Sequence, residues 1–108
     1  MASIPVCALL VQQGLEPVAQ MTCRDRNRLA MQADLLGAAA LGIHNVLCLS
    51  GDHSRWGDHP AAKNVYDVDS THLIRLVRNM VEHGCLDNGK EISPAPDFFV
   101  GAVANPFA

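Results

Sequence analysis

Residues 20–52 read QMTCRDRNRLAMQADLLGAAALGIHNVLCLSGD, and this pattern predicts a strand, a helix, a second strand and a Ser-Gly-Asp turn. The first strand is expected over Val18–Thr22 and the second over Asn45–Leu49, an uninterrupted apolar run. Such runs are typical of parallel strands covered on both faces, so the second strand is expected to be central. Loops at the carboxyl ends of parallel strands carry the chemistry in α/β proteins. Residues 22–23 and 50–52 therefore mark a candidate phosphate or cofactor site.

Two helices are expected around the first strand. The earlier one has Ser3 as its N-cap and stops at Gly14. The later one is capped by Asp25 and closed by Gly42. Its buried face is predicted from apolar residues that recur at helical spacing: Leu29, Ala33, Leu36 and Ala40.

A long loop, a third helix and a last strand are expected after the Ser-Gly-Asp turn. The polar segment from Gly51 to Asp67 has no periodicity and reads as a loop. Asp69 or Ser70 then caps a helix that ends at Gly84. The buried stripe of this helix is expected to be Leu73, Ile74, Val77, Met80 and Val81. The run at residues 98–103 is the last strand.

The expected fold class is α/β, with three parallel strands joined by helices. A helix between successive strands implies parallel pairing with right-handed crossovers. The chain has 108 residues, whereas a full eight-unit barrel needs about 250 residues. Residues 1–108 are therefore expected to form one unit, which is either part of a (β/α)8 TIM barrel or a small open sheet with two edges.

Composition limits the partners and the compartment. Only 18% of the residues are charged and the net charge is −3, so neither nucleic acid nor an anionic membrane is an expected partner. The apolar run at residues 1–14 has no basic lead-in and is too short to cross a bilayer. The four cysteines are scattered singly, which fits a reducing compartment. The expected location is the cytoplasm.

Several motifs in order resemble the methylenetetrahydrofolate reductase family. They are residues 20–52, followed by GDHP, VYDVDSTHLI and VGAVANP. The chain is most similar to the reductase portion of bifunctional homocysteine methyltransferase/methylenetetrahydrofolate reductases. The resemblance implies a TIM-barrel flavoprotein that holds FAD at the carboxyl ends of its strands. It also implies reduction of 5,10-methylenetetrahydrofolate to 5-methyltetrahydrofolate, in one-carbon metabolism and methionine biosynthesis. This chain would span the second helix to the fifth strand.

The resemblance also implies site residues. Asp52 matches an aspartate near the flavin ring and the folate, where its charge tunes the flavin and positions the pterin. The implied cofactor-binding residues are Gln20, Thr22, Ser50, Gly51, Asp52, Tyr66, Asp67 and Asn105. Three of them depart from the family pattern: Ser50 replaces an arginine, Gln20 a histidine and Asn105 a tyrosine.

The resemblance places two further family residues on strands that this chain does not match. An acidic glutamate belongs to the first strand and a folate-binding glutamine to the sixth. The chain alone is therefore expected to be inactive, and its missing strands are expected from self-association or from another subunit. The implied small-molecule partners are methylenetetrahydrofolate and NAD(P)H or another electron donor.

Two alternative functions come from the residues themselves. Exposed sheet edges suit a non-catalytic interaction or assembly domain. A repeated Gly-Asp-His offers carboxylate and imidazole ligands to a divalent metal, as in a metal-dependent hydrolase: Asp52, His53, Asp58 and His59.

Side chains after the first strand have two interpretations each. Arg24, Arg26 and Arg28 either hold an anionic cofactor group at a helix N-terminus or form a salt-bridged first turn with Asp25. Cys23 is either a thiol activated by Arg24 and Arg26 or a buried structural thiol.

Overall fold

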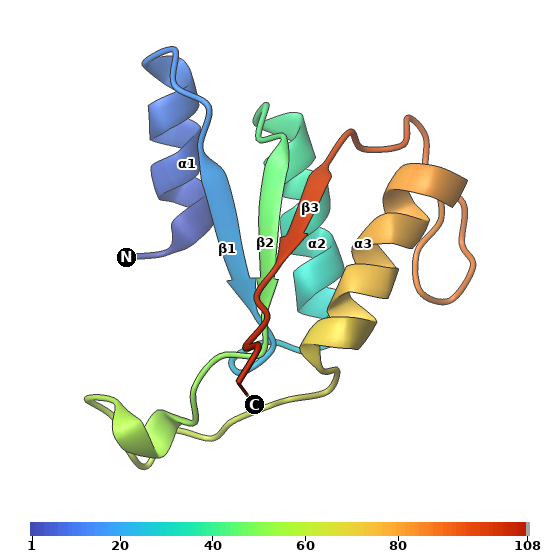
Figure 1. Ribbon diagram of the computed structural model, residues 1–108. Helices are drawn as coiled ribbons and strands as arrows, with labels where there is room; N and C mark the ends of the chain where they lie inside the picture. Colours follow the sequence, from blue (N-terminus) through green and yellow to red (C-terminus); the bar gives the residue numbers. More distant parts are fainter. Residues whose placement is uncertain (108) are drawn as a thin grey trace.

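The computed structural model describes residues 1–107, which form an open α/β unit (Figure 1). Its elements in chain order are α1 (Ser3–Gln12), β1 (Val18–Thr22), α2 (Arg28–Ala40), β2 (Asn45–Leu49), the 3₁₀ helix η1 (Ser54–Trp56), α3 (Ser70–His83) and β3 (Phe99–Ala102). The strands are parallel in the order β1-β2-β3. The predicted α/β class and the central position of the second strand are confirmed. The arrangement is consistent with part of a TIM barrel, and the sheet is not closed.

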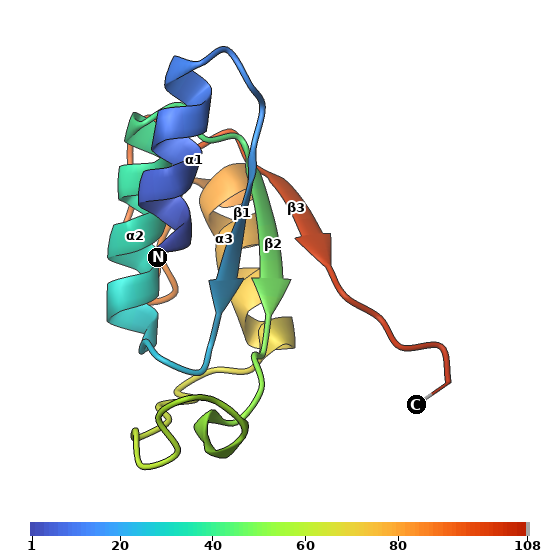
Figure 2. The same ribbon diagram turned by 90° about the vertical axis from the view of Figure 1, so that its left-hand side faces the viewer.

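The helices cover one face of the sheet and leave the other open. Figure 2 shows α1 and α2 on the same side of the strands. Ala19, Met21, Val46 and Cys48 belong to a single core cluster with buried residues of all three helices. On the opposite face, Val18 is 55% and Phe99 75% exposed, and the strand register puts them in one row with Asn45. In β2 itself, Asn45, Leu47 and Leu49 are half-buried on this face, so the expected cover of β2 on both faces is incomplete within residues 1–107.

The buried face of α2 differs from the predicted one. Leu29 is 74% and Leu36 40% exposed. The buried residues are instead Met31, Gln32, Leu35 and Ala38. Met31, Leu35 and Ala38 each follow a member of the predicted stripe by two residues, which corresponds to about 200° around the helix. The helix is apolar on both sides, so periodicity alone does not indicate which side faces the sheet.

Two predicted N-caps are also corrected. Asn27, not Asp25, caps α2: its side chain accepts a hydrogen bond from the N–H of Ala30 at 3.0 Å. Ser3 lies within α1, whose N-cap makes no side-chain hydrogen bond. The Ser3 hydroxyl instead accepts from the N–H of Gln20 at 3.0 Å. Ser3 thereby joins α1 to the edge strand β1.

The cap and the end of α3 are confirmed, its buried stripe includes Leu76 in addition to the predicted residues, and the last strand is shorter than expected. Asp69 caps α3 by accepting from the N–H of His72 at 2.7 Å, and Gly84 ends the helix with a φ of +58°. Its fully buried residues are Leu73, Leu76, Val77 and Met80, while Ile74 and Val81 are half-buried. Strand β3 stops at Ala102 because only residues up to Ala102 pair with β2. Across residues 1–107, every helix is too short or too polar to traverse a lipid bilayer.

Candidate functional site

Three segments meet at the carboxyl edge of the sheet. Thr22 ends β1 and residues 23–24 follow it, residues 50–52 follow β2, and residues 65–67 precede α3. The N–H of Val65 donates to Arg24 O at 2.7 Å, and the N–H of Tyr66 donates to Cys23 O at 3.2 Å. The long loop after β2 therefore returns to the end of β1 (Figure 1). We call Thr22, Arg24, Gly51, Asp52 and Tyr66 the strand-end cluster.

Gly51 brings the turn after β2 against β1. Its φ is +84°, a left-handed conformation that glycine adopts without steric cost. A Cβ at this position would lie 3.0 Å from Thr22 Cβ and 3.3 Å from Arg24 Cβ. The turn therefore depends on glycine for both its conformation and its close approach to the neighbouring strand.

Two side chains hold the main chain of this turn. The Tyr66 hydroxyl donates to Gly51 O at 2.8 Å, and Arg24 Nη1 donates to Asp52 O at 3.2 Å. The side chain of Asp52 is exposed. Within residues 1–107 its carboxylate takes part in none of the hydrogen bonds or ion pairs. The turn is thus held through its backbone while the carboxylate faces solvent at the end of the central strand.

The arginines after β1 form ion pairs. Arg24 Nε and Nη2 donate to the two carboxylate oxygens of Asp25 at 2.7 and 2.9 Å, and these bonds lower the pKa of Asp25. Arg26 pairs with Asp34 at 2.9 Å. Arg28 pairs with a carboxylate of the loop before α3. The structure therefore favours the salt-bridged interpretation over an anion-binding one.

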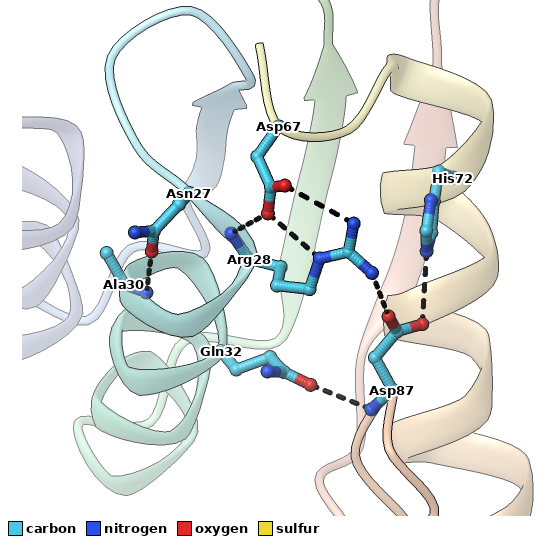
Figure 3. A network of polar contacts seen from close by, with 7 residues as sticks. All are labelled: Asn27, Arg28, Ala30, Gln32, Asp67, His72 and Asp87. Atoms are coloured by element: carbon cyan, nitrogen blue, oxygen red, sulfur yellow. Dashed lines mark hydrogen bonds and ion pairs between the residues drawn. The ribbon is translucent and has the colours of Figure 1, made fainter. Parts of the chain in front are cut away.

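Arg28 is the centre of a polar network that joins α2, α3 and the loop on each side of α3 (Figure 3). Its N–H and Nε both donate to Asp67 Oδ2, at 3.0 and 2.8 Å. Its Nη1 contacts Asp87 Oδ2 at 2.9 Å, and Asp87 Oδ1 lies 3.1 Å from His72 Nε2. The N–H of Asp87 donates to Gln32 Oε1 at 2.8 Å. The Arg28 hydrogen bonds lower the pKa of Asp67 to about 2.

Sequence reasoning missed this network. Arg28 and Asp87 are 59 residues apart, and His72 and Asp87 are 15 apart, so no helical or strand period relates them. The nearest signal was local: Asp67 closes the long loop just before the N-cap of α3. That signal indicated where Asp67 lies in the chain, but it did not identify Arg28 as its ion-pair partner.

The residues implied by the family resemblance fall into two groups. Thr22, Gly51, Asp52 and Tyr66 come together in the strand-end cluster, and Ser50 lies exposed beside them. Gln20, Asp67 and Asn105 make no hydrogen bond or ion pair with that cluster in the described part of the chain. Asn105 lies beyond β3, where its Oδ1 accepts from the N–H of Phe107 at 3.0 Å. The cofactor contacts of all eight residues remain predictions.

The thiols near the strand ends are buried. Cys23 is 0% and Cys48 1% exposed. Burial raises the pKa of Cys48 to about 11 and also raises that of Cys23. Both are free thiols. The structural interpretation of Cys23 is therefore favoured over the reactive one.

The Gly-Asp-His repeats do not assemble a metal site in residues 1–107, where no group of three or more His, Cys, Asp or Glu side chains is suited to hold an ion. His53 Nδ1 accepts from the N–H of Arg55 at 3.1 Å. Within residues 1–107 the imidazole of His59 pairs with its neighbour Asp58, at 3.3 Å on the surface. The metal-dependent hydrolase has no ligand set here.

An apolar cleft of about 530 Å³ lies at the opposite, amino end of the strands. It is lined by the last turns of α2 and by the connector before β3, including Leu36, Ile43 and Pro94. The cleft is therefore separate from the strand-end cluster.

Comparison with known proteins gives one family. The family model described as methylenetetrahydrofolate reductase matches residues 1–92. The match includes the whole strand-end cluster and the Arg28 network, and it stops before β3 and Asn105. No curated protein and no solved structure matches the chain.

Proposed function

The chain belongs to the methylenetetrahydrofolate reductase family, and we propose that it supplies part of the flavin and folate site of such an oxidoreductase. In this proposal Asp52 is the residue next to the flavin ring, and the reaction is reduction of 5,10-methylenetetrahydrofolate to 5-methyltetrahydrofolate. The cofactor is FAD, and NAD(P)H or another donor supplies the electrons. One-carbon metabolism, methionine biosynthesis and a cytoplasmic location belong to the same proposal.

The observation that carries this proposal is the exposed Asp52 carboxylate at the end of the central strand. Ligands of parallel α/β proteins bind at this edge. Thr22, at the end of β1, and Ser50, the first residue of the turn, both carry hydroxyl groups, which suit a polar ring edge. The arginines nearby are paired with Asp25, Asp34 and Asp67. The described residues therefore fit the ring of a flavin better than its diphosphate.

Bound FAD would supply the hydride chemistry. The contribution of this chain is to hold a negative charge at Asp52 and to orient hydroxyl groups beside it. The family resemblance places the proton-donating glutamate on a strand that the chain does not match. We therefore propose that turnover needs a further strand that carries this glutamate. A second copy of the chain has only the same three strands, so another subunit is the proposed source.

A titration with FAD, followed by flavin fluorescence, tests the proposal. Saturable binding by the full chain is expected, with affinity lowered about tenfold by Asp52→Ala, as for loss of one hydrogen bond to a charged group. Asp58→Ala is the matched control, because Asp58 lies in the second Gly-Asp-His and its side chain is 95% exposed. Absence of saturable binding, or equal loss in both variants, would contradict the proposal.

The assembly domain remains a second candidate, and the open sheet face favours it. Val18 and Phe99 expose apolar surface on a face that no described helix covers. This function predicts an oligomer that binds no flavin. The same titration, combined with a measurement of mass, separates the two candidates.

A further inference from the structure

Hydrogen bonds hold the backbone on both sides of the Asp52 Cα, from which the side chain projects. We propose that Tyr66 is a positioning residue that fixes the direction of Asp52, and that its hydroxyl does not bind the cofactor itself. Arg24 holds the second side of the same residue. The link to flavin rests on the proposed function, whereas the positioning of Asp52 rests on contacts within the chain.

Two successive carbonyl groups accept these hydrogen bonds. Tyr66 Oη donates to Gly51 O at 2.8 Å, and Arg24 Nη1 donates to Asp52 O at 3.2 Å. The two carbonyls belong to the peptide planes before and after the Cα of Asp52. Because each peptide unit is planar, fixing both planes fixes the φ and ψ of Asp52. The direction of its Cβ follows from those two angles.

Tyr66 is itself held in place. Its φ of +41° is uncommon for a residue with a side chain, and its N–H is bonded to Cys23 O. A conformation of this kind persists only where the surroundings impose it. A tyrosine hydroxyl carries one proton, which is used for Gly51 O, so the hydroxyl has no proton left to donate to a ligand.

Arg24 is held in a similar way. Two of its nitrogens donate to Asp25, and this fork fixes the plane of the guanidinium group. The remaining Nη1 then points at Asp52 O. Arg24 therefore contributes a fixed donor to the turn, and its charge is already balanced by Asp25.

The ligand-free test is backbone ¹⁵N relaxation of the full chain, which reports motion on the picosecond to nanosecond scale. Tyr66→Phe removes only the hydroxyl, and it should lower the order parameters of the Gly51 and Asp52 amides. Arg24→Gln should loosen the same amides. Ser54→Ala is the matched control, because it also removes a hydroxyl-to-carbonyl bond of the same loop, to Ala62 O at 2.9 Å. It should leave the Gly51 and Asp52 amides unchanged.

The second test is an FAD titration of Tyr66→Phe in two backgrounds. With Asp52 present, the affinity should fall about threefold to tenfold, the range for loss of one hydrogen bond. In the Asp52→Ala background, the same change should have little further effect, because the residue that Tyr66 positions is gone. Equal weakening in both backgrounds would mean that Tyr66 contacts the cofactor directly, and it would overturn the positioning role.

The two tests separate the two proposals. Unchanged order parameters in Tyr66→Phe overturn the positioning role whether or not flavin binds. If the wild-type chain binds no flavin, the proposed function fails, and the relaxation data alone then support or overturn the positioning of Asp52.

Discussion

Gly51 and Gly89 share a φ of +84° but have different surroundings. A Cβ at Gly51 would lie 3.0 Å from Thr22 Cβ, whereas nothing lies within 4 Å of one at Gly89. We expect Gly89→Ala to lower the free energy of unfolding by about 1 kcal/mol, the cost of a left-handed conformation for an alanine. Gly51→Ala should lower it by at least about 1 kcal/mol more, because Thr22 is held in a strand. Urea unfolding measures the free energy of unfolding of both variants. An equal decrease in the two would contradict a steric clash between a Cβ at residue 51 and Thr22.

Asp67 links stability to acid pH. Its pKa is about 2 in the folded chain because Arg28 donates to its carboxylate, and an aspartate in an unfolded chain has a pKa of about 4. The unfolded chain therefore binds the proton more tightly. The stability from Asp67 is fully present above about pH 4 and is lost as the pH falls toward about 2. Urea unfolding across this range should show a weaker pH dependence in Asp67→Asn than in the wild type.

Asp58→Asn is the control for this pH series. The Asp58 side chain is 95% exposed and, among residues 1–107, pairs with His59 alone, so its removal should leave the wild-type dependence between about pH 4 and pH 2 unchanged. An Asp67→Asn profile that matches the wild type would show that Arg28 does not stabilise the folded chain through this carboxylate.

At the scale of elements, α2 offers two adjacent leucines in opposite environments. Leu35 is 0% exposed and Leu36 is 40% exposed. Leu35→Ala should lower the free energy of unfolding by about 3 kcal/mol, because it leaves a cavity in the core. Leu36→Ala should cost less than about 1 kcal/mol. Urea unfolding of the two variants identifies the face of α2 that packs on the sheet, and a reversed order would restore the face predicted from the sequence.

The strands and α3 could be predicted because the sequence pattern of each fits only one kind of element. Val46–Leu49 is an uninterrupted apolar run, and Asp69 and Gly84 bound a helix with a single apolar stripe. In α2, by contrast, apolar residues lie on both faces, and contacts with the sheet decide between them. The N-cap of α2 was ambiguous as well, because both Asp25 and Asn27 are capping residue types. In the fold, Asp25 accepts hydrogen bonds from Arg24, and Asn27 caps the helix.

The candidate site could be located but not assembled from the sequence. Loops after parallel strands meet at one edge, so Thr22 and Gly51 were expected near each other. The bond from Tyr66 to Gly51 spans 15 residues of irregular loop, and no spacing rule predicts its direction. The ion-pair partner of Asp67 is Arg28 of α2, 39 residues away in the sequence, so the pair is identified only in the folded chain.

At the scale of the whole molecule, the sheet has a covered face and an open face. The open face carries no charged residue along the three strands; it presents Val18, Gln20, Thr22, Asn45, Leu47, Leu49, Phe99 and Gly101. Strands β1 and β3 are also unpaired edges within residues 1–107. An uncharged face that exposes Val18 and Phe99, together with free edges, favours association. The absence of charge means that two copies would meet there without electrostatic repulsion.

Two exposed phenylalanines distinguish association through this face from non-specific association through any exposed apolar side chain. Phe99 is 75% exposed on the open face, and Phe107 is 95% exposed in the segment after β3. If the face is an interface between copies or with another subunit, the wild-type chain should sediment as a concentration-dependent oligomer. Phe99→Ser should shift it toward the monomer, because it removes apolar area that association would bury. Phe107→Ser should leave the distribution unchanged. Sedimentation velocity over a concentration series measures both, and a wild-type monomer throughout, or equal shifts in the two variants, would rule out the open face as the interface.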